Sequence, residues 1–498
     1  MSGDLYSRFA QSFARFADRT LIEAESHDWT YAEIERAAGR LAARLQELGV
    51  APGERLLVQT AKSVEALILY VACARAGAIY LPLNVDYTES ELEYFVADAG
   101  PVLAVCDPEC TAVFGRIGGG HLSVRTLAQL FADLPETQLP PVPRGADDIA
   151  AILYTSGTTG KPKGAMLSNG NLVSNGEVLI DFWCFTAEDR LIHALPIFHV
   201  HGLFIAMHCA MFSGATVIFL PKFSSEVAIR HMANATVMMG VPTFYTRLLG
   251  DAAFTREVAS RMRLFISGSA PMSADIHRAF EERSGHRVLE RYGMTETGML
   301  TSNPYDGERR AGFVGLPLPG VDLRIAEFET GRVLAQGDVG IVEVRGPNIF
   351  KGYWKNPEKT AAEFRPDGYF ITGDMGQISS DGYVQLVGRE KDLIITGGLN
   401  VYPAEVEALL DDRADVAEAA VIGVPHPDFG EAVVAVVQPA TADFDEVAVA
   451  ADLRRELAGF KCPKAIIAVS ELPRNTMGKI QKKLLRERYA DMFAAAGT

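Results

Sequence analysis

The stretch Tyr154-Thr-Ser-Gly-Thr-Thr-Gly-Lys-Pro-Lys-Gly164 combines hydroxyl, glycine and lysine residues in one short loop. An apolar run, Ile149-Ala-Ala-Ile-Leu153, comes directly before it and is typical of a buried strand. Glycine lets backbone N–H groups approach an anion, hydroxyl groups donate to phosphate oxygens, and lysine adds positive charge. Pro162 stands where a Walker A loop has its hydroxyl residue, so this is a phosphate loop of another kind.

Outward from this loop, strand and helix patterns alternate. Thr30 and Glu33 form a capping-box signal for a helix over residues 31–48, and a strand (55–59), a helix (64–76) and a strand (78–81) follow. This rhythm predicts layered α/β sheets. Short apolar runs between turns predict a β-rich, barrel-like part over about 315–388, and α/β texture returns after it.

The length of 498 residues indicates more than one domain. We expect a large N-terminal α/β domain over residues 1–389 and a small, mobile C-terminal α/β domain over 390–498, with a hinge near 389–391.

Composition excludes several classes of protein. The net charge of −16 argues against a nucleic-acid surface, and no apolar run is long enough to cross a membrane. The N-terminus lacks a secretory signal pattern, and the six cysteines have no zinc-type spacing. Reduced thiols and the absence of a signal favour a cytoplasmic protein.

Four further motifs carry candidate chemistry. They are Ser267-Gly-Ser-Ala-Pro271, Glu290-Arg-Tyr-Gly-Met-Thr-Glu-Thr297, Tyr369-Phe-Ile-Thr-Gly-Asp374 and Pro473-Arg-Asn-Thr-Met-Gly-Lys479. A carboxylate such as Glu296 suits a hard cation held beside phosphate oxygens, and Asp374 could accept hydrogen bonds from both ribose hydroxyls. An ammonium such as that of Lys479 can stabilise a phosphoryl transition state without forming a bond.

Together, the loop and these motifs resemble the acyl-adenylate-forming superfamily over nearly the whole chain. The resemblance implies an enzyme that uses ATP and Mg²⁺ to activate a carboxylic acid and then transfers the acyl group to coenzyme A. It implies catalytic roles for Lys479, Thr155 and Glu296, metal binding by Glu296 and Thr155, a hinge at Lys391, and a tunnel for CoA at Gly397 and Gly398. The residues that it implies for ATP binding are Thr155, Ser156, Gly157, Thr158, Thr159, Lys163, Gly268, Ser269, Ala270, Glu290, Arg291, Tyr292, Thr295, Asp374 and Arg389.

The acid pocket is less specified by these motifs. Arg247 ends a stretch that we expect to line the pocket, and a buried arginine there would need an anionic partner such as a second carboxylate. The strings at residues 192–197, 240–247, 264–271, 291–297 and 301–307 resemble malonyl-CoA synthetases, although Gly298-Met-Leu300 departs from them. The resemblance implies that malonate is the acid and that methylmalonate is a further substrate. The residues expected to bind the acid are Arg247, His199, His201, Ser269 and Met294.

Other readings stay open at this point. A ligase for another short or aromatic acid would keep every ATP motif and would not need Arg247. An adenylation domain that loads a carrier protein and a non-enzymatic ATP sensor are two further alternatives. Related synthetases are inactivated by acetylation of the lysine that Lys479 matches, so the resemblance also implies a lysine acetyltransferase as a partner.

Overall fold

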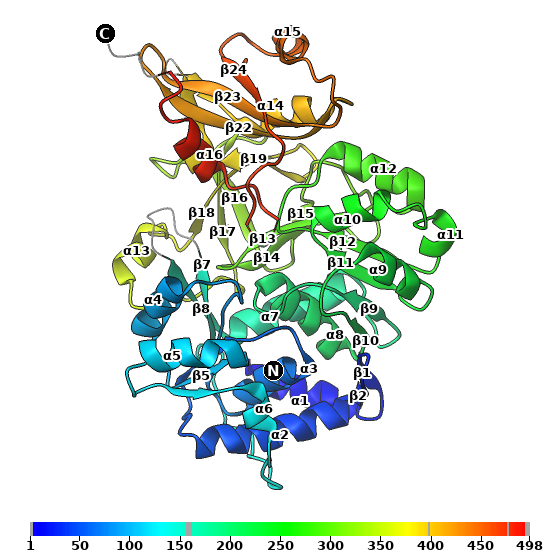
Figure 1. Ribbon diagram of the computed structural model, residues 1–498, viewed down its shortest axis with the longest axis vertical. Helices are drawn as coiled ribbons and strands as arrows, with labels where there is room; N and C mark the ends of the chain where they lie inside the picture. The colour runs from blue at the N-terminus through cyan, green and yellow to red at the C-terminus, as the bar shows by residue number, and fades with distance from the viewer. Residues whose placement is uncertain (1–2, 156–161, 397–398, 476–477, 494–498) are drawn as a thin grey trace.

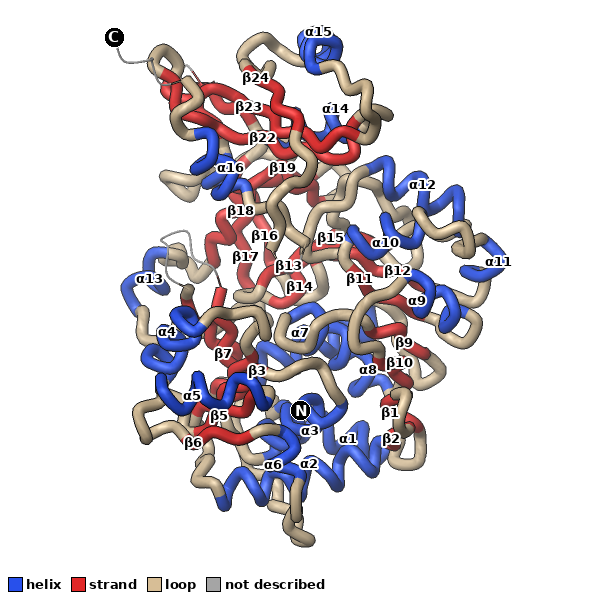
Figure 2. The backbone as a smooth tube through the Cα atoms, viewed as in Figure 1, coloured by secondary structure: helices blue, strands red, loops and turns tan. Residues whose placement is uncertain are grey.

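The computed structural model describes residues 3–155, 162–396, 399–475 and 478–493. They form four sheets with helices packed around them, and the part that follows residue 389 lies at one end of the molecule (Figures 1 and 2). The α/β class predicted from the sequence is confirmed.

Two large sheets make up most of the chain before residue 318. The first has the order β6 (Ser123–Arg125), β5 (Leu103–Cys106), β3 (Arg55–Gln59), β4 (Ile79–Pro82), β7 (Ile149–Thr155) and β8 (Lys163–Ser168). The second has the order β15 (Leu316–Pro317), β14 (Gly298–Ser302), β13 (Leu289–Met294), β12 (Leu264–Ser267), β11 (Val237–Gly240), β9 (Arg190–His193), β10 (Thr216–Phe219), β1 (Thr20–Glu23) and β2 (Asp28–Thr30).

Helices fill the space between these sheets and cover their outer faces (Figure 1). The main core joins inward-facing side chains of both sheets to α1 (Leu5–Arg15), α2 (Tyr31–Glu47), α3 (Val64–Arg75), α7 (Asn169–Phe182), the π-helix η2 (His201–Met207) and α8 (His208–Ser213). On the outer face of the nine-stranded sheet lie α9 (Ser225–Met232), α10 (Pro242–Leu249), α11 (Arg256–Ala259) and α12 (Ala274–Ser284). The six-stranded sheet is covered by α4 (Glu89–Ala99), η1 (Pro108–Cys110) and α5 (Thr111–Ile117), and α6 (Leu127–Phe131) contacts α2.

The predicted capping box is present at the start of α2. The Thr30 hydroxyl accepts from the Glu33 backbone N–H at 3.2 Å, and the Glu33 carboxylate accepts from the Thr30 N–H at 2.8 Å. Because both groups satisfy donors that a helix N-terminus leaves free, the sequence signal fixes where this helix begins.

The β-rich stretch is a four-stranded antiparallel sheet, β16 (Asp322–Ala326), β17 (Gly340–Arg345), β18 (Phe370–Ile378) and β19 (Val384–Arg389). Gly315 bridges to Val384, which ties this sheet to the nine-stranded one, and α13 (Pro357–Ala362) lies beside it. The turn η3 (Glu390–Asp392) leads to the last sheet. Its strands are β20 (Ile394–Thr396), β21 (Leu399–Val401), β22 (Val416–His426), β23 (Gly430–Pro439) and β24 (Ala465–Ala468). The helices of this part of the chain are α14 (Pro403–Asp411), α15 (Glu446–Glu456) and α16 (Lys482–Tyr489).

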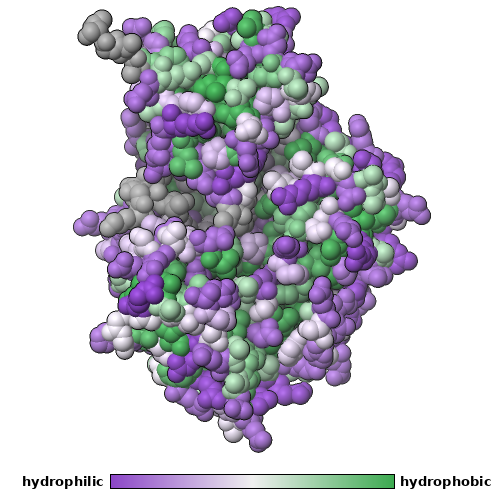
Figure 3. Space-filling view, in the orientation of Figure 1, coloured by the Kyte–Doolittle hydropathy of each residue, from purple (hydrophilic) through white to green (hydrophobic). Residues whose placement is uncertain are grey.

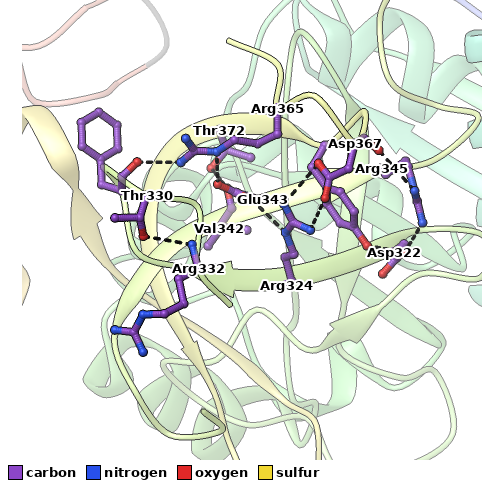
Figure 4. Close-up of polar contacts among 12 residues, drawn as sticks. Asp322, Arg324, Thr330, Arg332, Val342, Glu343, Arg345, Arg365, Asp367 and Thr372 are labelled. Atoms are coloured by element: carbon purple, nitrogen blue, oxygen red, sulfur yellow. Dashed lines mark hydrogen bonds and ion pairs between the residues drawn. The ribbon is translucent and has the colours of Figure 1, made fainter. Parts of the chain in front are cut away.

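A buried carboxylate, Glu343, holds the four-stranded sheet together (Figure 4). It accepts from Arg324 Nε at 2.9 Å and from Arg365 Nε at 2.7 Å, and Arg324 also reaches the half-exposed Asp367 at 2.6 Å. Glu343 lies on β17, next to β18, the strand that carries Asp374. The cluster therefore secures the backbone of a candidate site residue.

Replacing Glu343 with alanine should lower the free energy of unfolding by roughly 3 to 5 kcal/mol, because it leaves two guanidinium groups without their buried partner. The Asp367→Ala variant removes an exposed partner of the same Arg324, so its cost should stay below about 1 kcal/mol. Urea denaturation of both variants measures the difference, and equal losses would contradict this role for Glu343.

No helix in the described parts of the chain is long and apolar enough to cross a membrane. On the face shown in Figure 3, hydrophilic and hydrophobic residues are intermingled.

Candidate active site

The candidate site lies at the carboxyl ends of the central strands of the nine-stranded sheet. Strands β9, β11, β12 and β13 run parallel, so their carboxyl ends lie on the same side. In open α/β sheets, ligands bind outside the carboxyl ends of the strands. The predicted motif at residues 267–271 begins at the last residue of β12, and the motif at 290–297 runs along β13 and past its end. The topology therefore brings the two motifs together.

The phosphate loop joins two paired strands. Thr155 ends β7 and pairs in register with Lys163, the first residue of β8. Ser156, Gly157, Thr158 and Thr159 lie outside the described residues. The Lys163 ammonium is 3.2 Å from Glu363 and 4.5 Å from the centroid of the Tyr353 ring. The ends of the hairpin are therefore anchored to residues near α13.

Glu296 is a buried carboxylate beside this hairpin. It accepts from the hydroxyls of Thr155 and Tyr353, both at 3.2 Å, and burial raises its pKa. The same Tyr353 hydroxyl lies 2.5 Å from Glu363 Oε2, and its one proton can be donated to only one of the two carboxylates at a time. The oxygens of Glu296 and Thr155 form a donor set that suits Mg²⁺. Tyr353 and Glu363 were missed by the sequence reasoning, since neither belongs to a recognisable motif.

Asp374 joins three elements at the opposite side of the site. Its carboxylate accepts from the Tyr292 hydroxyl at 2.6 Å and from Arg389 Nε at 3.0 Å, and it is itself buried. Tyr292 comes from β13, Asp374 from β18 and Arg389 from β19. These three predicted residues therefore form one cluster, and the carboxylate keeps lone pairs for a sugar hydroxyl.

Lys479 enters the site from the C-terminal part of the chain. The side chain is half-buried, and its backbone N–H donates to Asn475 Oδ1 at 2.9 Å. Burial lowers the pKa of Lys479 to about 8; nearby Arg389 and Arg291 lower it, while Asp374 and Glu296 raise it. These four groups surround the ammonium: Arg291 and Glu296 come from the motif at residues 290–297, Asp374 from that at 369–374, and Arg389 from the end of β19.

The acid end of the site differs from the prediction. Arg247 lies on α10 with an exposed side chain, so the expectation of a buried arginine at this position is wrong. Helix α10 turns Tyr245 and Leu248 toward the core, and Arg247, between them, faces outward.

A different arginine is buried at this end. Arg291 is 4% exposed, and no described residue accepts a hydrogen bond from its Nε or Nη2. Burial lowers the pKa of Arg291 to about 10. A Cβ built on Gly268 would lie 2.3 Å from Arg291 Nη1, so glycine is needed there for the guanidinium to fit. The resemblance implied ATP binding by Arg291, and the structure places this residue beside Gly268 and near His199 and His201.

His201 and Ser269 adjoin this arginine. His201 is buried, its Nδ1 lies 3.2 Å from the Ser269 hydroxyl, and its Nε2 has no partner among the described residues. Ser269 has a positive φ of 70°, a strained backbone conformation that directs it into the site. His199 Nδ1 accepts from the His201 backbone N–H at 3.2 Å, and burial lowers the pKa of His199 to about 3. Burial lowers the pKa of His201 as well, which favours the neutral form of both imidazoles.

The remaining predicted residues differ in how deeply they are buried. Glu290 is buried, accepts from the Met272 N–H at 3.2 Å, and has a pKa raised to about 8 by burial. Met294 and Thr295 are half-buried at the end of β13, Ala270 is half-buried after β12, and Lys391 is exposed on η3. Gly397 and Gly398 lie outside the described residues.

With this geometry, the class of protein follows from comparison with known proteins. The AMP-binding enzyme family matches residues 9–354, and its C-terminal domain matches residues 405–479. The chain belongs to this family and is an AMP-forming acyl-CoA synthetase, a ligase that works through an acyl-adenylate. ATP and CoA are its substrates, and Mg²⁺ is usual in the family.

Individual relatives narrow the comparison. ATP-bound MatB from Rhodopseudomonas palustris is 53% identical, with a TM-score of 0.96 over 99% of this chain and 100% of that one. The same protein without ATP gives 0.84, so the arrangement described here is closer to the ATP-bound one. Malonate–CoA ligase of Arabidopsis thaliana is 33% identical over 98% of this chain and 89% of its own length. Feruloyl-CoA synthase of an Amycolatopsis species is 36% identical over 92% and 94%.

Proposed function

We propose that this enzyme converts malonate, ATP and CoA to malonyl-CoA, AMP and pyrophosphate through malonyl-AMP. The observation that supports malonate is the buried guanidinium of Arg291, whose Nε and Nη2 have no hydrogen-bond partner among the described residues. A buried cation without an anion is costly, and a bidentate pair with a second carboxylate would satisfy it. The similarity to a malonate–CoA ligase points the same way.

The neighbouring groups suit the same ligand. If the Ser269 hydroxyl donates to His201 Nδ1, the proton of the neutral imidazole is on Nε2, which then offers a donor to an acid oxygen. We infer that Arg291 and His201 bind the distal carboxylate and that His199, Ser269 and Met294 complete the acid pocket. Arg247 has no role in it.

The proposed roles in ATP binding follow from the groups around Glu296, Asp374 and Lys479. We propose that Asp374 and Arg389 bind the ribose, that residues 268–270, Glu290 and Tyr292 surround the adenine, and that Thr295 and Lys163 contact phosphate. Glu296 and Thr155 would hold Mg²⁺, which when bound neutralises phosphate charge. Ser156 to Thr159 keep their predicted phosphate role as part of this proposal.

Lys479 would then act in adenylation, since its ammonium can meet the charge that develops at the α-phosphate. We also propose that residues 390–498 form a domain that turns about a hinge at Lys391, withdraws Lys479, and presents Gly397 and Gly398 to the CoA thiol.

The charge requirement at Lys479 also supports regulation by a lysine acetyltransferase. Mass spectrometry of enzyme treated with such a transferase would test this, and full activity with Lys479 completely acetylated would end the idea.

A survey of acids tests the proposed function. AMP release and the mass of the thioester product are measured with malonate, methylmalonate, succinate, octanoate and ferulate. Malonate should have the highest kcat/KM, and methylmalonate should follow within about 10- to 200-fold, because one methyl group is separated weakly by packing. The similarity to feruloyl-CoA synthase makes an aromatic acid the second candidate. A preference for ferulate would show that ferulate, and not malonate, is the acid that this enzyme uses.

A further inference from the structure

A half-buried lysine that belongs to none of the ATP motifs contacts the end of β9. Lys62 follows β3 and its ammonium donates to three acceptors: His193 Nδ1 at 2.8 Å, the His193 carbonyl at 2.8 Å, and the Leu220 carbonyl at 2.6 Å. It also lies 4.3 Å from the centroid of the Phe219 ring. Burial lowers the pKa of Lys62, and no carboxylate among the described residues offsets that shift. Its three donors are therefore used entirely on one histidine and its surroundings.

This arrangement fixes the tautomer of His193. The Gly202 carbonyl can only accept, so the His193 Nε2 that faces it carries the ring proton, and Nδ1 is left to accept from Lys62. His193 Nε2 then donates to the Gly202 carbonyl at 2.9 Å. The ring is fully buried and stacks on Phe219 at 5.7 Å between centroids and an interplanar angle of 13°. Lysine, histidine and carbonyl thus form a directed chain of hydrogen bonds.

The chain ends directly beside the acid pocket. Gly202 follows His201 in η2, and a Cβ at Gly202 would lie 2.0 Å from the Pro196 carbonyl oxygen. The loop that carries His199 and His201 therefore closes tightly on itself and is held at Gly202 by His193. Because His201 and Gly202 are neighbours in the chain, a shift of the Gly202 backbone would also move the His201 imidazole relative to Ser269 and Arg291.

We propose that Lys62 and His193 are positioning residues of the acid pocket, which hold His201 in place through the Gly202 carbonyl. This rests on the proposed function only in that His201 contacts the acid. A role in folding alone would affect ATP and the acid equally, whereas a positioning role separates the two. Misplacing a binding group by about 1 Å can reduce activity about 100-fold.

The test uses four variants of the full-length enzyme. Lys62→Met removes the ammonium, and His193→Phe keeps an aromatic ring beside Phe219 but has no donor. His193→Gln restores both a donor for Gly202 and an acceptor for Lys62. The matched control is Lys222→Met, an exposed lysine that follows β10.

Steady-state kinetics are measured with the acid that the wild-type enzyme uses best. We expect KM for the acid to rise about 10- to 100-fold in Lys62→Met and His193→Phe, while KM for ATP stays within about twofold. His193→Gln should recover most of the loss, and Lys222→Met should match the wild type.

Equal rises in both KM values, or equal losses in His193→Phe and His193→Gln, would overturn the inference. Should Lys62→Met fail to fold, the comparison of the two His193 variants decides. A wild-type preference for an acid other than malonate would refute the proposed function and leave this comparison intact, so the two failures can be told apart.

Discussion

Replacing Arg291 with methionine is expected to lower kcat/KM for malonate by about 10³-fold, since truncating one partner of a buried charge pair leaves the other unpaired. The loss should appear in the KM for malonate, while the KM for ATP stays nearly unchanged. Arg291→Lys should recover only part of the loss, because an ammonium cannot make the bidentate contact of a guanidinium.

Stability gives this variant a second, opposite readout. Without substrate, no described residue pairs with Nε or Nη2 of Arg291, and burial already disfavours its charge. Replacement by an apolar side chain of similar length should therefore leave the melting temperature unchanged or raise it. The exposed Arg247→Met serves as the control, and malonate activity that depends on Arg247 instead of Arg291 would contradict the pocket described above.

Replacing Lys479 with alanine should slow adenylation by about 10²- to 10³-fold, the usual effect of removing one electrostatic contact to a transition state. Malonate-dependent exchange of pyrophosphate into ATP measures this half-reaction. Transfer from synthetic malonyl-AMP to CoA should be nearly unaffected, because Lys479 is proposed to have left the site by then.

The two half-reactions serve as controls for each other. Equal losses in both would point to a general structural role for Lys479, and full exchange activity in the variant would exclude it from adenylation. Lys479→Gln, which resembles the acetylated side chain, should behave like the alanine variant.

The local elements were predictable where short-range chemistry determines them. The capping box at Thr30 and Glu33 places α2, and the apolar run before Tyr154 places β7. The long C-terminal strands β22 and β23 follow from their β-branched runs. The gathering of Tyr292, Asp374 and Arg389 was implied by the family resemblance, and the structure brings these residues into contact.

The acid pocket could not be predicted, for a geometric reason. Arg247 follows Phe244-Tyr-Thr246 and Arg291 follows Val288-Leu-Glu290, and the sequence does not show which arginine side chain turns inward. On α10 the inward positions are Tyr245 and Leu248, so Arg247 faces solvent. Arg291 points inward from β13 and fits only because Gly268 on the neighbouring segment has no side chain. This depends on a contact between residues distant in sequence.

The Lys62–His193 pair illustrates the same limit. Residues 131 positions apart share a hydrogen bond; Lys62 belongs to no motif, and His193 lies in a string that indicated the family but no role for this side chain. A lone lysine after a strand is usually solvated, so only the tertiary structure identifies its three buried acceptors.

The most direct test of the central claim compares malonate with monomethyl malonate in the wild-type enzyme. The ester keeps the carboxylate that is adenylated and removes the charge that Arg291 is proposed to bind. We predict a kcat/KM for malonate about 10⁴-fold higher, because the ester leaves a buried donor unpaired. Equal values for the two acids would show that Arg291 does not recognise a second carboxylate, and would contradict malonate as the substrate that this pocket selects.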